Sequence, residues 1–301
     1  MWTDRRVLHE DVELAWVEQG EGPVVIFLSG GPGDGATYLR PLAEPVSREW
    51  RCVVPDLRGT GGSRLIAADA PLTIDALFED LDRLRLEAGV DCVALVGHSF
   101  GATLALLYAA ARPGAVSGAA LVGLGPLDDA AADQARTRLV AALSPDRRTG
   151  WATARSRRRA AFERGDAEAF RHAFLAQMEI AMPAFVVDVD AGRRLIEARR
   201  QAFDHNPAVH AALVADLASV DQWAAVDRLR TPVLVLYGEQ DFEPIAQAEL
   251  IAERAGQVDV LVLPGAAHLP WIDRPAAVTD ALLTFLRGLR DLMSPELESG
   301  R

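Results

Sequence analysis

The stretch that most constrains this chain is Val93–Gly101, which reads VALVGHSFG. An apolar run of strand length stops at Gly97, Ser99 stands between Gly97 and Gly101, and the Ala- and Leu-rich segment that follows favours a helix. A serine between two glycines, after a strand and before a helix, is typical of a sharp turn that lifts its hydroxyl above the end of a sheet. The glycines are needed because side chains on both sides of so tight a turn would collide. The pattern predicts that Ser99 is a nucleophile.

Strands and helices alternate on both sides of this stretch. Short apolar runs of strand length recur along the chain, and residues 73–86 have apolar side chains at helical spacing, with Thr73 or Asp75 near the start as a cap. Continuously apolar strands separated by helices indicate an α/β protein whose mostly parallel sheet is covered by helices on both faces. The expected buried strands are Val24–Leu28, Cys52–Pro55, Val93–Val96, Ala119–Leu124, Val233–Tyr237 and Val258–Leu263, with a weak edge strand at Val12–Val17 and a closing helix at Pro275–Leu289.

A helical segment interrupts the sheet pattern. Residues 127–226 contain only Ala- and Arg-rich amphipathic stretches, and their 14 Arg balance 14 Asp plus Glu, whereas the rest of the chain carries the whole net charge of −12. A change in charge that coincides with a change in pattern indicates a separate subdomain. We therefore expect residues 1–126 and 227–301 to form the α/β core and residues 127–226 to form a helical cap, inserted after the strand that follows the helix after Ser99.

Composition limits the partners and the compartment. The net charge of −12 argues against nucleic-acid binding, and no apolar run approaches the roughly 20 residues that cross a bilayer. The charged N-terminus lacks the apolar region of a signal peptide. Cys52 and Cys92 lie in strand-like runs and are expected to be buried thiols. The sequence predicts a cytoplasmic protein that binds neither nucleic acid nor membrane, and it leaves the oligomeric state open.

Two further residues follow strand ends and complete a catalytic set. A serine hydroxyl needs a base to take its proton and a third group to orient that base. Asp241 and His268 each come directly after an expected strand, and the carboxyl ends of parallel strands meet at one edge of a sheet. Ser99, Asp241 and His268 are therefore the predicted catalytic residues. Asp128 or Asp129, after an earlier strand, is the rival acid, and a turn residue or a buried structural histidine is the simpler interpretation of Asp241 and His268 taken singly.

The order Ser99, Asp241, His268 in this context resembles the α/β-hydrolase fold, whose cap lies where this chain has its insertion. The resemblance covers residues 12–126 and 227–290. Within that fold, Ser29–Gly33 and Asp56–Ser63 are similar to motifs of the proline-iminopeptidase-like serine hydrolases, which usually read His-Gly-Gly-Pro-Gly and Asp-x-Arg-Gly-x-Gly-x-Ser. Ser29 replaces the usual histidine. The Asp56–Ser63 loop is expected to fasten the end of the sheet and not to touch substrate.

The resemblance also implies an oxyanion hole and substrate-binding residues. The backbone N–H groups of Gly31 and Phe100 would hold the oxyanion, and a glycine loop suits this role because no side chain obstructs its donors. Peptidases of this family recognise a free α-amine through acidic side chains, for which Glu179 and Glu243 are the candidates. Two tryptophans, Trp151 in the insertion and Trp271 after His268, are candidates for lining the pocket.

We therefore expect a serine hydrolase that cleaves an ester or amide bond of a small-molecule or short-peptide substrate through an acyl-enzyme, without a metal or other cofactor. A proline-iminopeptidase-like aminopeptidase is one form of this activity, and an esterase or lactonase is another. An acyltransferase or lyase on the same fold has the same catalytic residues. A non-catalytic ligand-binding homologue is the remaining class, and it normally lacks one of the three.

Overall fold

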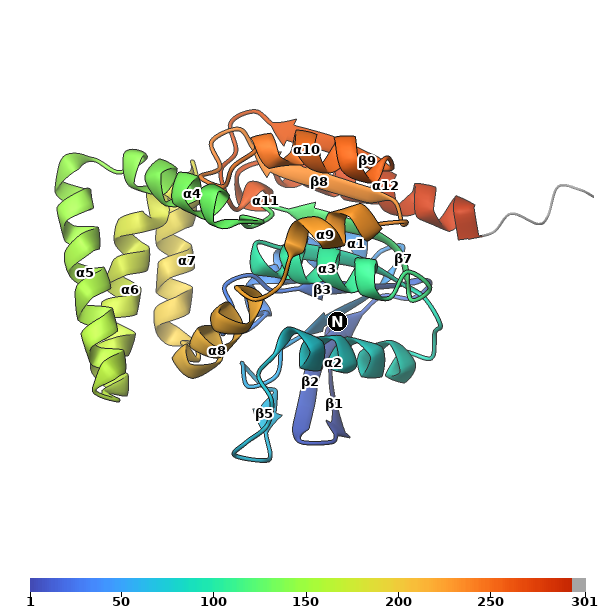
Figure 1. Cartoon of the computed structure of the whole chain (residues 1–301), viewed down its shortest axis with the longest axis horizontal. Helices are drawn as coiled ribbons and strands as arrows, with labels where there is room; N and C mark the ends of the chain where they lie inside the picture. Colours follow the sequence, from blue (N-terminus) through green and yellow to red (C-terminus); the bar gives the residue numbers. More distant parts are fainter. Residues whose placement is uncertain (294–301) are drawn as a thin grey trace, which may run out of the picture.

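A nine-stranded, mostly parallel sheet runs through the molecule in the order β1-β2-β4-β3-β6-β7-β8-β9, with β5 paired to β2 (Figure 1). The computed structural model describes residues 1–293, and the side chains of 291–293 are not described. Only the pairings of β2 with β1, β4 and β5 are antiparallel. The strands are β1 Thr3–His9, β2 Val12–Gln19, β3 Val24–Leu28, β4 Arg51–Pro55, β5 Arg64–Leu65, β6 Val93–His98, β7 Val116–Val122, β8 Val233–Gly238 and β9 Val258–Leu263.

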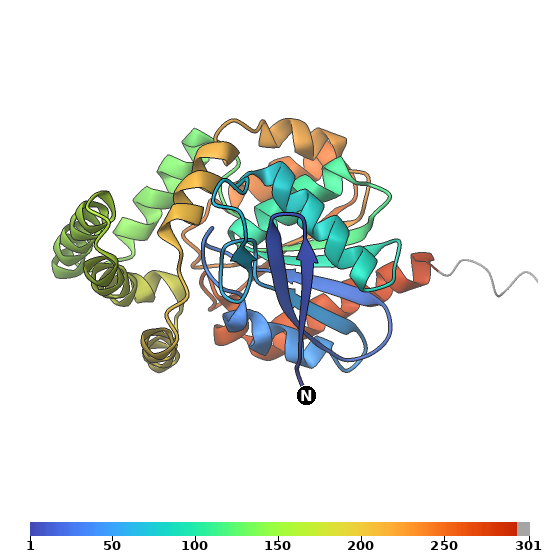
Figure 2. The ribbon, with the colours of Figure 1, turned by 90° about the horizontal axis from the view of Figure 1, so that it is seen from below.

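Helices cover both faces of the sheet and divide its side chains between two hydrophobic cores. In β3, Val24, Ile26 and Leu28 pack into the core under α2, α3 and α10, while Val25 and Phe27 pack into the core under α1 and α12. Successive residues of a strand point to opposite faces, so a strand buried on both sides must be apolar throughout. The helices are η1 Thr37–Leu39, α1 Arg40–Val46, α2 Ile74–Glu87, α3 Phe100–Ala111, α10 Ala246–Ala255, α11 Pro270–Asp273 and α12 Pro275–Met293. Figure 2 shows α2 and α3 on one face and α1 and α12 on the other. The expected α/β-hydrolase architecture is confirmed.

Six helices lie between β7 and β8, and no strand occurs among them. They are α4 Asp129–Ala141, α5 Pro145–Glu163, α6 Ala167–Phe185, α7 Val189–Gln201, α8 Pro207–Leu217 and α9 Gln222–Arg228. Helices α5, α6 and α7 stand clear of the sheet (Figure 1), whereas α9 packs into the core beside α3 through Ala225 and Val226. The expected boundary between residues 226 and 227 falls inside α9, and the division into core and cap stays a prediction.

Two strands, β1 and β5, and the helices α1, α10 and α11 were not expected from the sequence, and the ends of several expected elements shift. Strand β1 was not expected, because its side chains are mostly exposed and charged and leave no apolar pattern. Helix α2 begins after Thr73, whose hydroxyl accepts the Ala76 N–H at 3.2 Å, as a capping residue does. Residues 294–301, which end the expected core, lie outside the described residues. Within the described part of the chain, no helix is both long and apolar enough to span a membrane.

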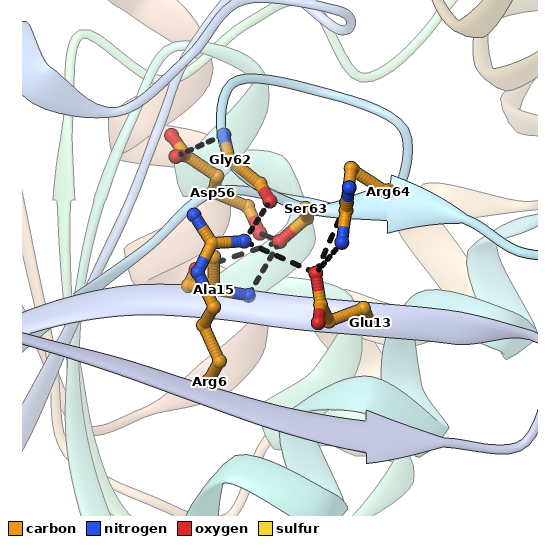
Figure 3. Close-up of polar contacts among 7 residues, drawn as sticks. All are labelled: Arg6, Glu13, Ala15, Asp56, Gly62, Ser63 and Arg64. Atoms are coloured by element: carbon orange, nitrogen blue, oxygen red, sulfur yellow. Dashed lines mark hydrogen bonds and ion pairs between the residues drawn. The ribbon is translucent and has the colours of Figure 1, made fainter.

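The Asp56–Ser63 loop ties β2 and β5 to the sheet end. The Asp56 carboxylate accepts the Gly62 N–H at 2.8 Å and the Ala36 N–H at 2.7 Å. The Ser63 hydroxyl donates to the Asp56 carbonyl at 2.7 Å and accepts the Ala15 N–H at 2.9 Å (Figure 3). These bonds fasten the end of the sheet, as the sequence predicted, and the Gly59 carbonyl also accepts the Asn206 side-chain amide at 2.8 Å. That the loop does not touch substrate stays a prediction.

Candidate active site

Ser99 occupies the strained turn between β6 and α3. Its φ of +54° and ψ of −118° lie in a region that L-residues rarely adopt. A Cβ on Gly97 would lie 2.1 Å from the Gly101 carbonyl oxygen, and a Cβ on Gly101 would lie 2.1 Å from the Leu28 carbonyl oxygen. Both positions of the Gly-x-Ser-x-Gly pattern therefore exclude any side chain, for the steric reason that the sequence indicated.

Asp241 and His268 meet in the interior. Asp241 follows β8, His268 follows β9, and His268 Nδ1 lies 2.9 Å from Asp241 Oδ1. Both residues are buried, with 1% and 2% of their surfaces exposed. Because an ionised carboxylate only accepts, Nδ1 carries the proton, and Nε2 of a neutral ring is left with its lone pair. Burial opposes the charged ring, but the charge and hydrogen bond of Asp241 leave the pKa of His268 above its ordinary value.

The end of β7 joins this pair to Ser99. The Ser99 N–H donates to the Val122 carbonyl at 2.9 Å, so the elbow is fixed to the last residue of β7. The next residue, Gly123, has a φ of +55°, and a Cβ there would lie 3.1 Å from His268 Nδ1 and 3.2 Å from Asp241 Oδ2. The absence of a side chain at Gly123 leaves the space that the buried histidine and aspartate occupy. The three residues thus gather at one edge of the sheet.

Two backbone donors stand beside the elbow without partners. Phe100 is the first residue of α3, and Gly31 lies in the loop after β3 with a φ of +56°. Among the described residues, neither N–H donates a hydrogen bond. The loop approaches the serine closely, since a Cβ on Gly30 would lie 2.8 Å from Ser99 Cβ. Both N–H groups thus belong to residues beside the Ser99 turn and have no partner among the described residues.

The rival acid is engaged elsewhere. Asp128 caps α4, where its carboxylate accepts the Ala131 N–H at 2.8 Å, and it also accepts the Trp223 indole N–H at 2.8 Å. The His268 ring hydrogen-bonds to Asp241. The geometry therefore favours Asp241 over Asp128 as the partner of His268.

Glu243 lies next to this pair and is the most unusual acid of the site. Only 6% of its surface is exposed, and its Oε2 has no hydrogen-bond partner among the described residues. Its backbone N–H donates to Asp241 Oδ1 at 3.0 Å. Burial and the nearby Asp241 charge outweigh the attraction of His268 and Arg138 and raise the pKa of Glu243 to about 8. A carboxyl group with a free oxygen is thus held beside the predicted base.

The other candidate substrate residues lie in different settings. Glu179 on α6 is exposed and pairs with Arg200 at 2.6 Å. Trp151 on α5 is half-buried, and the Arg155 guanidinium lies over its ring at 5.4 Å. Trp271 on α11 is buried and packs edge-on against His98 at 4.8 Å between ring centroids. Of the four predicted substrate-binding residues, Glu243 has the closest contact with the Asp241–His268 pair.

Several aromatic residues pack around the site; Phe242 and Tyr38 carried no sequence signal of a role there, whereas Phe185 belongs to the aromatic residues of the insertion from which the sequence predicts an apolar pocket. The rings of Phe242 and Phe185 pack on His268 at 4.5 and 5.4 Å between centroids. Tyr38, in η1, lies against His98 at a centroid separation of 5.7 Å. These contacts join distant parts of the chain, so no local pattern predicts them. Among the described residues, no group of three or more His, Cys, Asp or Glu is placed to hold a metal ion.

Comparison with known proteins places this chain among α/β hydrolases. A proline iminopeptidase from Neisseria meningitidis is 37% identical over 115 residues, which are 37% of this chain and 36% of that protein, so the match spans about a third of the curated relative. The crystal structure of a proline iminopeptidase-related protein from Thermus thermophilus superposes with a TM-score of 0.72 at 26% identity, covering 96% of this chain and 98% of the other. A thermophilic esterase from Thermogutta terrifontis gives 0.71 at 27% identity, covering 96% and 99%. The family model described as "alpha/beta hydrolase fold" matches residues 23–275, and the chain belongs to that family.

Proposed function

We propose that this protein is a serine hydrolase in which Ser99, His268 and Asp241 form the catalytic triad. The observation that carries the proposal is the buried 2.9 Å hydrogen bond between His268 and Asp241, at the same sheet edge as the strained Ser99 turn. That hydrogen bond fixes the tautomer in which Nε2 accepts a proton. The family membership and the hydrolases among the similar proteins support the same assignment.

The reaction is acyl transfer to water. Ser99 Oγ attacks the substrate carbonyl carbon while His268 Nε2 takes the hydroxyl proton, and Asp241 stabilises the resulting imidazolium. The carbonyl oxygen becomes an oxyanion held by the N–H groups of Gly31 and Phe100. As the intermediate collapses, His268 gives its proton to the leaving amine or alcohol. Water then attacks the acyl-enzyme carbonyl with His268 again as base. As this second intermediate collapses, the bond to Ser99 Oγ breaks, His268 returns the proton to Ser99 Oγ, and the carboxylic acid is released.

The substrate proposed is a small molecule or short peptide, bound under the helices between β7 and β8, which we propose form a cap. Glu243 is the proposed contact for a cationic or hydrogen-bond-donating group of the substrate, because its Oε2 is buried and lacks a partner among the described residues. A bound cation would stabilise the ionised form of this carboxyl and so lower its pKa from the raised value of about 8. The proline iminopeptidase relatives favour an amino-terminal proline substrate. The similarity to the Thermogutta esterase favours a simple ester as the second candidate.

Two free thiols, Cys52 and Cys92, support the expected cytoplasmic location.

The test compares initial rates of wild-type and Ser99→Ala protein on proline arylamide and on a short-chain nitrophenyl ester. Loss of the nucleophile should lower kcat by about 10⁴-fold or more on any true substrate. Cleavage of proline arylamide by the wild type alone supports an aminopeptidase, and Glu243→Gln should then reduce kcat/KM for that substrate more than for the ester. Turnover of the ester alone supports an esterase. Wild-type rates in Ser99→Ala would refute the triad.

A further inference from the structure

A chain of hydrogen bonds connects the glycine loop after β3 to the backbone of His268. The Gly30 N–H donates to Tyr38 Oη at 2.6 Å, and Tyr38 Oη lies 2.9 Å from His98 Nδ1. His98 Nε2 lies 3.1 Å from the His268 carbonyl oxygen. The chain therefore starts next to Gly31, the proposed oxyanion donor, and ends on the proposed catalytic base.

The partners at the two ends fix every proton in between. The His268 carbonyl can only accept, so His98 Nε2 carries the hydrogen, and in a neutral ring Nδ1 must then accept. Tyr38 donates its hydroxyl hydrogen to that nitrogen, which leaves a lone pair of Oη for the Gly30 N–H. Burial, and then the charge of His268, lower the pKa of His98 well below its ordinary value, so the ring is neutral as this pattern requires.

The surroundings leave this chain little freedom. A Cβ on Gly30 would lie only 2.8 Å from His98 Nδ1. The ring of His98 packs between those of Trp271 and His268, each 4.8 Å away between centroids. In the glycine loop, the Gly31 carbonyl accepts the Asp34 N–H at 2.8 Å. Among the described residues, the donor of Gly30 and the acceptor of Gly31 are thus both occupied, while the N–H of Gly31 is not.

We propose that Tyr38 and His98 are positioning residues that hold the proposed oxyanion loop and His268 in fixed positions relative to Ser99; this rests on the function proposed above. Neither touches the reacting atoms. Tyr38 restrains Gly30 and so the direction of the adjacent Gly31 N–H, and His98 restrains the peptide group of His268. His98 thereby couples the proposed oxyanion loop to His268, and these are the two parts of the site where charge develops during the reaction.

The variant that isolates this role is Tyr38→Phe, which keeps the ring and removes the hydroxyl. The Gly30 N–H and His98 Nδ1 then both lose their partner. Tyr108→Phe is the matched control, because the Tyr108 hydroxyl likewise makes an internal hydrogen bond, donating to Asp82 at 2.8 Å between α3 and α2 and outside the site. Removing one oxyanion donor outright costs about 10²- to 10³-fold, so loosening its support should cost about 10- to 100-fold.

The kinetic measurement is the reaction of each variant with a fluorophosphonate probe, which needs only an activated serine and no knowledge of the substrate. We expect Tyr38→Phe to lower the maximal labelling rate about 10- to 100-fold with little change in the apparent binding constant, and Tyr108→Phe to leave that rate unchanged. Equal rates for the two variants, or an effect on binding alone, would overturn the positioning role. Failure of the wild type to label, with Ser99→Ala as reference, would instead overturn the proposed function.

An independent measurement needs no catalysis. Imidazole ¹⁵N chemical shifts of the wild-type protein distinguish the two neutral tautomers of His98 and its charged form. We expect the Nε2–H tautomer at neutral pH and still at pH 6.5, where an ordinary histidine is half charged, because the pKa of His98 is lowered. An Nδ1–H tautomer, or a charged ring at pH 7, would overturn the hydrogen-bond chain even if the protein is an active hydrolase.

Discussion

Replacing Glu243 with glutamine should change how the stability of this protein depends on pH. The buried carboxyl has a pKa raised from an ordinary 4.5 to about 8. The folded state therefore keeps the Glu243 proton at pH values where the unfolded chain has lost it. Between these two pKa values, deprotonation of the unfolded chain alone lowers the free energy of unfolding as the pH rises. Below pH 4.5 both states are protonated, and above about pH 8 both are ionised.

The size of the effect follows from the difference between the two pKa values. One pKa unit corresponds to about 1.4 kcal/mol, so a rise from 4.5 to about 8 corresponds to about 5 kcal/mol. Glutamine has a similar shape and does not ionise. The free energy of unfolding of Glu243→Gln minus that of the wild type should therefore increase by several kcal/mol between pH 5 and pH 8 and then level off. Taking the difference between the two proteins removes, to first order, the titration of groups they share.

The assay is urea denaturation of wild-type and Glu243→Gln protein at unit intervals from pH 5 to pH 9. Glu253→Gln is the control, because Glu253 is exposed on α10 and its carboxyl remains in water when the chain folds. The difference between Glu243→Gln and the wild type should rise by about 1.4 kcal/mol per pH unit in the middle of the range, and the control difference should stay flat. A difference that does not vary with pH would refute the raised pKa.

Two predictions concern the framework. Asp80→Asn should lower the free energy of unfolding by about 3–5 kcal/mol, because Arg58, 2% exposed and bonded twice to Asp80 at 2.7 Å, would keep a buried charge whose remaining ion-pair partner, Asp11, lies 3.7 Å away; a loss below about 1 kcal/mol in urea denaturation would contradict this. Gly101→Ala should abolish hydrolysis and lower Tm, because its Cβ would lie 2.1 Å from the Leu28 carbonyl oxygen; an active variant with unchanged Tm would show that the turn relaxes.

The sequence predicted the sheet and the positions of Ser99, Asp241 and His268 because both depend on local patterns. A strand buried on two faces is apolar throughout, and groups that directly follow parallel strands meet at one edge. The sequence did not predict β1, since an exposed edge strand such as Thr3–His9 needs no apolar side chains. The contact of Asp241 with His268 was expected and is present, while their catalytic roles remain proposals.

Contacts between distant segments account for what the sequence could not supply. His98 stands next to Ser99 in the sequence, but its bonds to Tyr38 and His268 depend on where η1 and the loop after β9 come to lie. The burial of Glu243 likewise depends on packing around the β8–α10 loop. A short spacing from Asp241 singled out Glu243, but spacing carries no information about solvent access or a raised pKa.

The direct pairing of β7 with β8 bears on how this protein can diversify. Ala119 to Val122 pair in register with Val233 to Leu236, although the chain between them forms six helices. The two strands hold the same register whatever length of chain departs from one and returns to the other, because the entropy of closing a loop grows only slowly with its length. Among the helices between these strands, those that do not pack into the core can therefore be shortened, extended or exchanged in evolution while the sheet stays in place, whereas α9, which packs beside α3 through Ala225 and Val226, is tied to it.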